Sequence, residues 1–184
     1  WTKLDGANTW TFSQTTGLLT LAVVTDPFIP WAATYFGAET NPAIIGKAAD
    51  PDNDGLNNLA EFALNSAPNS SSNAGKIVGK VATVGGNSVL TLTLPVRNGA
   101  TFTDDLTTHE EVSALTDGLI YRIQGTTDLS AWTLDVSEVG AGAERDAIQL
   151  GLPALDTGWT YRTFRAPGSV SSSASDFLRV KVTE

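Results

Sequence analysis

The stretch Asp50-Pro51-Asp52-Asn53-Asp54-Gly55-Leu56-Asn57-Asn58-Leu59-Ala60-Glu61 has the spacing of a 12-residue calcium-binding loop. Counted from Asp50, carboxylates stand at positions 1, 3 and 5, and a glutamate stands at position 12. Calcium takes about six to eight oxygen ligands, and alternate aspartates in a tightly turning loop converge on one point. The sequence therefore predicts a Ca²⁺ site whose ligands are Asp50, Asp52, Asp54, Leu56, Asn58 and Glu61.

Each remaining position of the loop has a role that fits this chemistry. Gly55 supplies a sharp turn that a residue with a Cβ resists, and Leu56 turns its carbonyl toward the ion. Glu61 reaches back from the first turn of the following helix and offers both oxygens. Asn58 either adds a ligand through water or caps that helix, with Glu61 at the N3 position. The alternative, an acidic surface turn without an ion, is disfavoured because every ligand position is filled.

The segment before the loop departs from an EF-hand. Asn57 stands at position 8, where an aliphatic residue usually pairs two loops, and Pro42, Gly46 and Pro51 interrupt any long incoming helix. The one upstream helix that we expect is short, over 31–36, and ends at Gly37. This pattern favours a site that stabilises structure over one that senses calcium pulses.

Composition restricts the class of protein. The chain has 184 residues, enough for one large domain or two small ones, and its 41% hydrophobic content allows true cores. With 11 Lys and Arg against 20 Asp and Glu, the net charge of −9 makes nucleic acid and anionic membrane surfaces poor partners. Cysteine is absent, and no apolar run is long enough for a membrane insertion.

Other features of the composition indicate where the protein works. Few lysines and many Thr, Ser, Asn and Gly residues are typical of a secreted or surface protein of bacteria. No signal peptide is visible. The chain lacks methionine and begins at Trp1 within an expected strand, so we interpret it as a processed or excised piece of a longer precursor.

The chain divides into four expected segments. Residues 1–25 form a β-hairpin, 26–66 a helical segment with the calcium loop, 67–75 a linker, and 76–184 a β-sandwich. In the hairpin, Asn8–Ser13 alternates with Trp10 and Phe12 on one face, and Leu18–Val24 follows as a more buried strand. Residues 3–6 are expected to form a turn. Because a hairpin alone is marginal, it must rest on this chain, on an upstream domain or on a neighbouring molecule.

The helical segment is expected to have its own small core. Leu59, Phe62 and Ala63 recur at helical spacing in a second helix over Asn58–Asn65, and Trp31, Phe36 and Phe62 are expected to cover the loop.

From residue 76 onward, strand candidates alternate with turn residues, and Gly85-Gly86-Asn87 fits a hairpin turn. The predicted strands are Lys76–Val84, Ser88–Val96, Leu119–Thr126, Trp132–Val139, Asp146–Gly151, Trp159–Arg165 and Asp176–Thr183. The stretch 98–118 is either a surface excursion or carries an extra strand around 101–106. The predicted fold is thus mainly β, an antiparallel β-sandwich (immunoglobulin- or fibronectin-like) with an N-terminal β-hairpin and a small helix–calcium-loop–helix insert.

Three stretches together resemble the C-terminal region of large secreted or cell-surface bacterial proteins. Trp10–Leu21 looks like the closing hairpin of autotransporter-repeat-like regions. Ala49–Leu64 is similar to thrombospondin type 3 and dockerin-like calcium loops of the form DPDxDGxxNxxEF. Tyr121–Trp132 with Phe177–Val182 looks like the terminal β-sandwich of such proteins. The resemblance implies an extracellular surface or assembly role, with Ca²⁺ on Asp50, Asp52, Asp54 and Glu61, and it implies no catalytic residues.

The residues give no sign of an enzyme. His109 is the single histidine, its Thr107–Glu111 surroundings lack a second histidine, and no Gly-x-Ser-x-Gly elbow occurs. The acidic residues near it are expected to form a solvated loop, with a second, weaker cation site as the alternative: Asp104, Asp105, Glu110 and Glu111.

The functional hypothesis is therefore a non-enzymatic, calcium-stabilised extracellular structural module. Residues 1–25 are expected to add to the sheet edge of a neighbouring copy, giving a homo-oligomer or filament. The alternative is a carbohydrate-binding or adhesion module, in which exposed Trp132, Trp159 and Tyr161 would stack on a surface glycan. For both tryptophans a place in the core is the favoured interpretation.

Overall fold

The computed structural model describes the whole chain except residues 6–7, 23–25, 73 and 171–174. The N-terminal segment is a three-stranded antiparallel sheet in the order β1-β2-β3, with β1 at Thr2–Asp5, β2 at Asn8–Ser13 and β3 at Leu18–Ala22. The predicted hairpin is confirmed as β2 and β3. The turn expected at 3–6 is wrong, because Lys3 pairs with Trp10 within a third strand; Gly6 itself lies outside the described residues.

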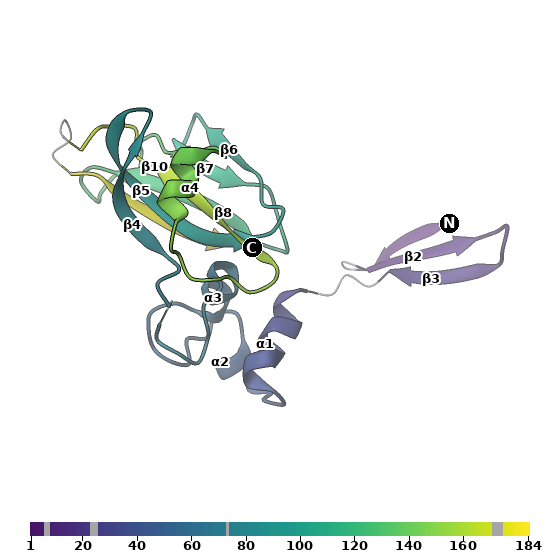
Figure 1. Ribbon diagram of the computed structural model, residues 1–184. Helices are drawn as coiled ribbons and strands as arrows, with labels where there is room; N and C mark the ends of the chain where they lie inside the picture. Colours follow the sequence, from purple (N-terminus) through teal and green to yellow (C-terminus); the bar gives the residue numbers. More distant parts are fainter. Residues whose placement is uncertain (6–7, 23–25, 73, 171–174) are drawn as a thin grey trace.

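The strand β3 is also less buried than expected. Leu18, Leu19 and Leu21 are 57%, 54% and 42% exposed, and the end of the predicted strand, at 23–24, lies outside the described residues. In Figure 1 the sheet stands apart from the rest of the molecule, so none of the other described helices and strands covers its leucines.

The helical segment contains α1 at Phe28–Phe36, α2 at Pro42–Ile45 and α3 at Asn58–Leu64. Both predicted helices are confirmed, and α1 starts three residues early because Asp26 Oδ1 accepts a hydrogen bond from the Phe28 N–H at 2.9 Å. Trp31 and Phe62 lie in the core as expected, and their ring centroids are 5.3 Å apart. Phe28, which was not predicted, is the third ring, with centroids 5.4 and 5.7 Å from those of Trp31 and Phe62, whereas the expected Phe36 is only partly buried against this core. No helix in the described part of the chain is long and apolar enough to span a membrane.

The remaining strands form two four-stranded antiparallel sheets, in the orders β4-β5-β10-β9 and β11-β8-β7-β6. Side chains from the two sheets, such as Leu94 and Phe164 on one and Tyr121 and Ile123 on the other, share one buried core. The fold is thus mainly β, consistent with a β-sandwich. The strands are β4 Val78–Val84, β5 Asn87–Arg97, β6 Phe102–Asp105, β7 Glu110–Ser113, β8 Ile120–Thr126, β9 Ser137–Glu138, β10 Trp159–Arg165 and β11 Phe177–Thr183.

Two of the predicted strands are wrong. The stretch predicted as a strand at Asp146–Gly151 belongs to a helix, α4 at Ala143–Gln149, which buries Ile148 against Val84, Val89 and Val139. Its run of Ala, Glu, Arg and Gln has strong helix propensity, which outweighed the apolar alternation. The stretch Trp132–Val139 keeps only the two residues of β9, since the preceding turn is held by Asp128, whose Oδ1 accepts from the Ser130 and Ala131 N–H groups.

The stretch 98–118 carries strands, as one of the two alternatives allowed. β6 and β7 form a hairpin there, and β7 in turn pairs with β8. β6 coincides with the extra strand expected around 101–106, whereas β7 was not predicted.

The sandwich holds the C-terminal end of α3 by hydrogen bonds to its last carbonyls. Tyr121 Oη donates to the Ala63 carbonyl at 2.8 Å, and Trp159 Nε1 donates to the Phe62 carbonyl at 2.9 Å. Lys76 Nζ donates to the carbonyl and the Oδ1 of Asn65, at 2.8 and 2.9 Å. These carbonyls have no partner within the helix, so the sandwich completes α3, and the two segments share a single core.

We expect Tyr121→Phe to lower the free energy of unfolding by about 1–3 kcal/mol. The hydroxyl of Tyr121 is buried, donates to Ala63 and accepts from the Arg97 N–H at 3.0 Å, so both partners lose a hydrogen bond. Urea denaturation measures the change. Tyr161→Phe is the matched control, because its hydroxyl reaches Pro153 in a half-buried position and should cost less. Equal effects of the two variants would contradict the role given to Tyr121.

Candidate metal centre

The loop from Asp50 to Asn57 is folded by hydrogen bonds from its own backbone to its aspartates. Asp50 Oδ2 accepts from the Gly55 N–H at 3.0 Å, and Asp54 Oδ1 accepts from the Leu56 N–H at 2.8 Å. Gly55 has φ +93°, a conformation that side chains with a Cβ rarely adopt. Asp50 and Asp54 thus each use one carboxylate oxygen to fold the loop, and the other oxygen can bind a cation.

The three aspartates come together as the sequence predicts. One carboxylate oxygen from each of Asp50, Asp52 and Asp54 lies within 4.8 Å of the others. Five buried side-chain oxygens of this 12-residue stretch have no hydrogen-bond donor among the described residues: Asp50 Oδ1, Asp52 Oδ2, Asn58 Oδ1, and Oε1 and Oε2 of Glu61. Buried oxygens without a donor are costly, and a cation would satisfy all of them at once. All the atoms that could bind a metal here are oxygens, and oxygens are the ligands that hard cations prefer.

Glu61 is the most perturbed carboxyl group of the loop. It is fully buried, and burial raises its pKa from the ordinary 4.5 to about 8, helped by the charges of Asp52, Asp54 and Asp50. The group of oxygens within 4.8 Å comprises the aspartates alone. Glu61 therefore approaches their charges from α3 and would complete the site.

Asn57 and Asn58 divide the two roles that the sequence left open for Asn58. Asn57 is the N-cap of α3, and its Oδ1 accepts from the Ala60 N–H at 2.9 Å, so the capping role given to Asn58 is wrong. Asn58 is buried, and its Nδ2 donates to the carbonyls of Ile44 and Gly46 at 2.8 and 2.9 Å. Its Oδ1 stays free to act as a ligand, directly or through water.

The element before the loop is α2, a helix of about one turn, and not the long incoming helix of an EF-hand. Asn58 N–H donates to the Ala49 carbonyl at 2.8 Å, and Leu59 N–H donates to the Lys47 carbonyl at 3.0 Å. Together with the Asn58 side chain, these bonds fix the loop between α2 and α3. That Asn58 binds the carbonyls of Ile44 and Gly46 was not predicted, because these contacts depend on the position of α2.

The other acidic candidates do not form a comparable cluster. Asp105 accepts from the Thr107 and Thr108 N–H groups of its own turn. Glu110 accepts from Arg122 and Gln124, and Glu111 accepts from the Glu138 N–H at 3.1 Å. Within the described ranges, the three aspartates are the single group of carboxylates placed to hold a metal.

The remaining candidates lie elsewhere on the sandwich. His109 is on the exposed turn between β6 and β7, with Nδ1 2.6 Å from Asp135 Oδ1. Trp159 contacts Phe62 edge-on and has Arg97 4.2 Å from its ring centroid, which places it where α3 meets the sandwich. Trp132 lies 3.6 Å from the Arg179 guanidinium, and Tyr161 is half-buried. Both tryptophan rings are thus already engaged by arginine side chains.

Comparisons with protein-family models, with curated proteins and with solved structures found no match to this chain. The resemblance to bacterial surface proteins therefore stays a prediction, and the chemistry of the loop carries the functional argument.

We expect the metal-free protein to lose stability as the pH rises from about 4.5 to about 8. In this window folded Glu61 holds its proton, because its pKa is about 8, whereas the unfolded chain has released it. The free energy of unfolding should fall by up to about 1.4 kcal/mol per pH unit for this one group. Chemical denaturation in a chelator measures the slope. A slope that is unchanged in Glu61→Gln would show that another group causes it.

Proposed function

We propose that this chain is a non-enzymatic, calcium-stabilised structural module of a secreted or cell-surface protein, used in assembly. The observation that carries the proposal is the set of five buried oxygens without a donor, gathered by one 12-residue loop. These oxygens would coordinate calcium, and the charge of the ion would offset the repulsion among Asp50, Asp52, Asp54 and Glu61.

Calcium is favoured over magnesium by the number and kind of ligands. Four carboxylates, the Asn58 amide and the Leu56 carbonyl offer more oxygens than the six that magnesium needs in strict octahedral geometry. Magnesium also keeps most of its water, whereas the free oxygens of this loop are buried. Millimolar extracellular calcium would fill such a site permanently.

The ion would stabilise more than its own loop. Glu61 belongs to α3, and the last carbonyls of α3 are held by Tyr121 and Trp159 of the sandwich. Drawing Glu61 toward the aspartates therefore fixes the helix against both sheets. The immunoglobulin- or fibronectin-like identity of the sandwich, and filament growth by strand addition of residues 1–25, are finer proposals that rest on the sequence.

We expect Glu61→Gln to have opposite effects with and without calcium. In a chelator at pH 8 the variant should be more stable than the parent, because it removes a buried charge from beside three aspartates. In calcium it should lose at least about tenfold in affinity, equal to about 1.4 kcal/mol. Titration calorimetry measures the affinity, and thermal unfolding in both buffers measures the stability.

The matched control is Asp146→Asn, which neutralises an exposed carboxylate on α4, far along the chain from the loop. It should bind calcium like the parent. For the parent, about 2.7 kcal/mol of stabilisation is expected when calcium is present at about a hundred times its Kd. A parent chain that neither binds calcium nor gains stability from it would end the proposal.

A further inference from the structure

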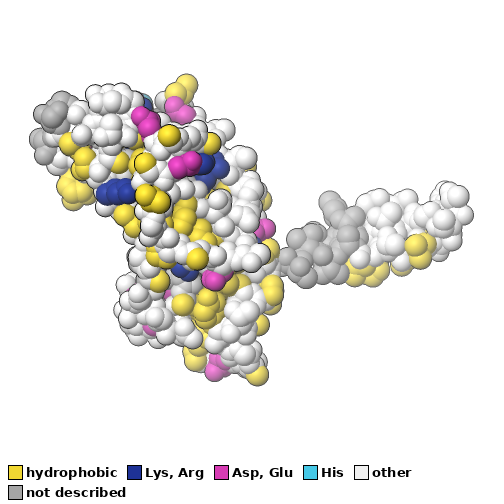
Figure 2. Space-filling view, viewed as in Figure 1, with side chains coloured by type: hydrophobic (Ala, Val, Ile, Leu, Met, Phe, Trp, Pro, Cys, Tyr) yellow, Lys and Arg dark blue, Asp and Glu magenta, His cyan; other side chains and the backbone are white. Residues whose placement is uncertain are grey.

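The N-terminal sheet gathers most of its described large apolar side chains on one face. The register of the three strands places six side chains on the apolar face: Trp1, Lys3, Trp10, Phe12, Leu19 and Leu21. Thr2, Thr11 and Thr20 lie on the opposite face, together with one exposed apolar side chain, Leu18. Trp1 is 65% exposed and Phe12 36%, and Figure 2 shows hydrophobic side chains gathered along one side of this sheet. We refer to these six residues as the apolar face.

A face of this kind needs a covering layer. Small isolated sheets are marginal in water unless their hydrophobic side packs against something. The sheet stands apart from the helices and the sandwich in Figure 1. Within the described residues, no layer covers the apolar face in the arrangement of one chain.

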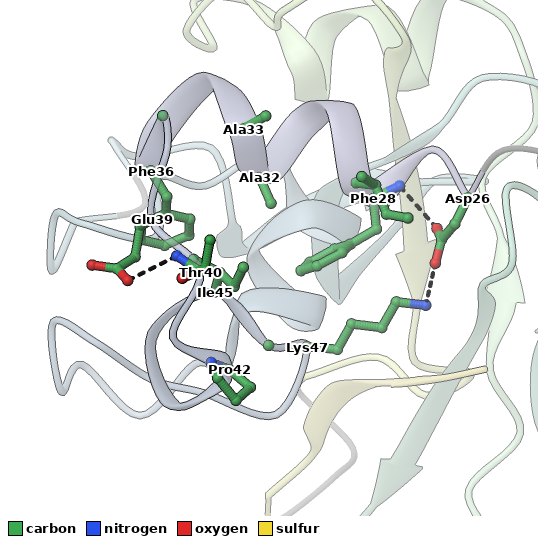
Figure 3. Close-up of a pocket in the computed structure, with 13 residues that line it drawn as sticks. Asp26, Phe28, Ala32, Ala33, Phe36, Glu39, Thr40, Pro42, Ile45 and Lys47 are labelled. Carbon is green, nitrogen blue, oxygen red and sulfur yellow. Dashed lines mark hydrogen bonds and ion pairs between the residues drawn. The ribbon is translucent and has the colours of Figure 1, made fainter.

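The helical segment carries a matching apolar groove. It runs between α1 and α2, has a volume of about 430 Å³, and is lined chiefly by Phe28, Ala32, Phe36, Pro42 and Ile45. Figure 3 shows these side chains converging on the space between the helix and the turn. Ile29, which also lines the groove, is 65% exposed. Two apolar surfaces thus lie open on the same chain.

The charges at the two surfaces are complementary. Lys3 lies exposed among the aromatic side chains of the apolar face. At one end of the groove, the Glu39 carboxylate accepts only from the Thr40 and Asn41 N–H groups, both at 2.8 Å, and no cation among the described residues pairs with it. At the other end Lys47 is shared between Asp26 and Glu184. The groove is therefore acidic overall and would accept a lysine.

We propose that the apolar face of one copy docks into the α1–α2 groove of a second copy, with Lys3 against Glu39. The proposal rests on the assembly role proposed above and names its surfaces, with face packing in place of strand addition. Each copy has one face and one groove, so the contact is heterologous and extends into a head-to-tail chain. Because the patch is small, each contact is weak, in the range of transient interfaces. The apolar side chains supply the affinity, and the ion pair sets the orientation.

Analytical ultracentrifugation of the full chain in about 1 mM calcium, from about 10 to 500 μM protein, tests this contact. We expect the average mass to rise with concentration. Leu19→Lys on the apolar face and Ile29→Lys in the groove should each weaken association at least tenfold. Both side chains are exposed, so both variants should stay folded. Thr20→Lys, on the opposite face of the same strand, should associate like the parent.

A charge exchange tests the pairing itself and distinguishes a second copy from closure within one chain. Lys3→Glu and Glu39→Lys should each weaken association, and a mixture of the two variants should associate again. If the face folded onto its own groove, mixing would restore nothing, and the parent would stay monomeric at every concentration. Either of these results would overturn the proposal, as would unchanged association of Leu19→Lys and Ile29→Lys.

Calcium titration of the same samples separates this inference from the proposed function. A parent chain that binds calcium but stays monomeric overturns the docking alone. A chain that associates through the apolar face but does not bind calcium overturns the calcium-stabilised module and leaves the docking intact.

Discussion

The crowding of three carboxylates, with a fourth buried near their charges, is the constraint on which the rest of the structure depends. Asp50, Asp52 and Asp54 place oxygens within 4.8 Å of one another, and buried Glu61 faces them with its pKa raised to about 8. Like charges at this distance repel, and burial adds to the cost. Such an arrangement persists only if a proton or a cation compensates it. If the loop binds a cation as proposed, folding and ion binding are linked in one equilibrium.

The helix α3 connects the loop to the sandwich. Its first turn carries Glu61, and its last carbonyls are bonded by Tyr121 and Trp159. A helix of seven residues has little stability of its own, so its two ends depend on what holds them. The helical segment and the sandwich consequently share one core and are not independent domains.

Much of this could be predicted from local patterns, and the failures have identifiable causes. The three aspartates, α1, α3 and the strands β4, β5, β8, β10 and β11 follow from spacing and alternation that neighbouring residues alone enforce. In residues 146–151 the apolar pattern around Ile148 fits a strand as well as a helix. The predicted strand is wrong because the helix propensity of the neighbouring residues decides between the two. The role of Asn58 depends on carbonyls of α2, and that of Trp159 depends on α3. Contacts across such sequence distances leave no local signal.

The bonds between Lys76 and Asn65 have a consequence for how this protein can change in evolution. Lys76 holds both the carbonyl and the side-chain oxygen of Asn65, so the two ends of the serine-rich stretch between them are fixed beside each other. The entropy of closing a loop grows slowly with its length, by about 0.6 kcal/mol for each doubling. Residues can therefore be added or removed here without moving the ion site on one side or the sheets on the other. The stretch is a natural position for insertions, including a tag or a further domain.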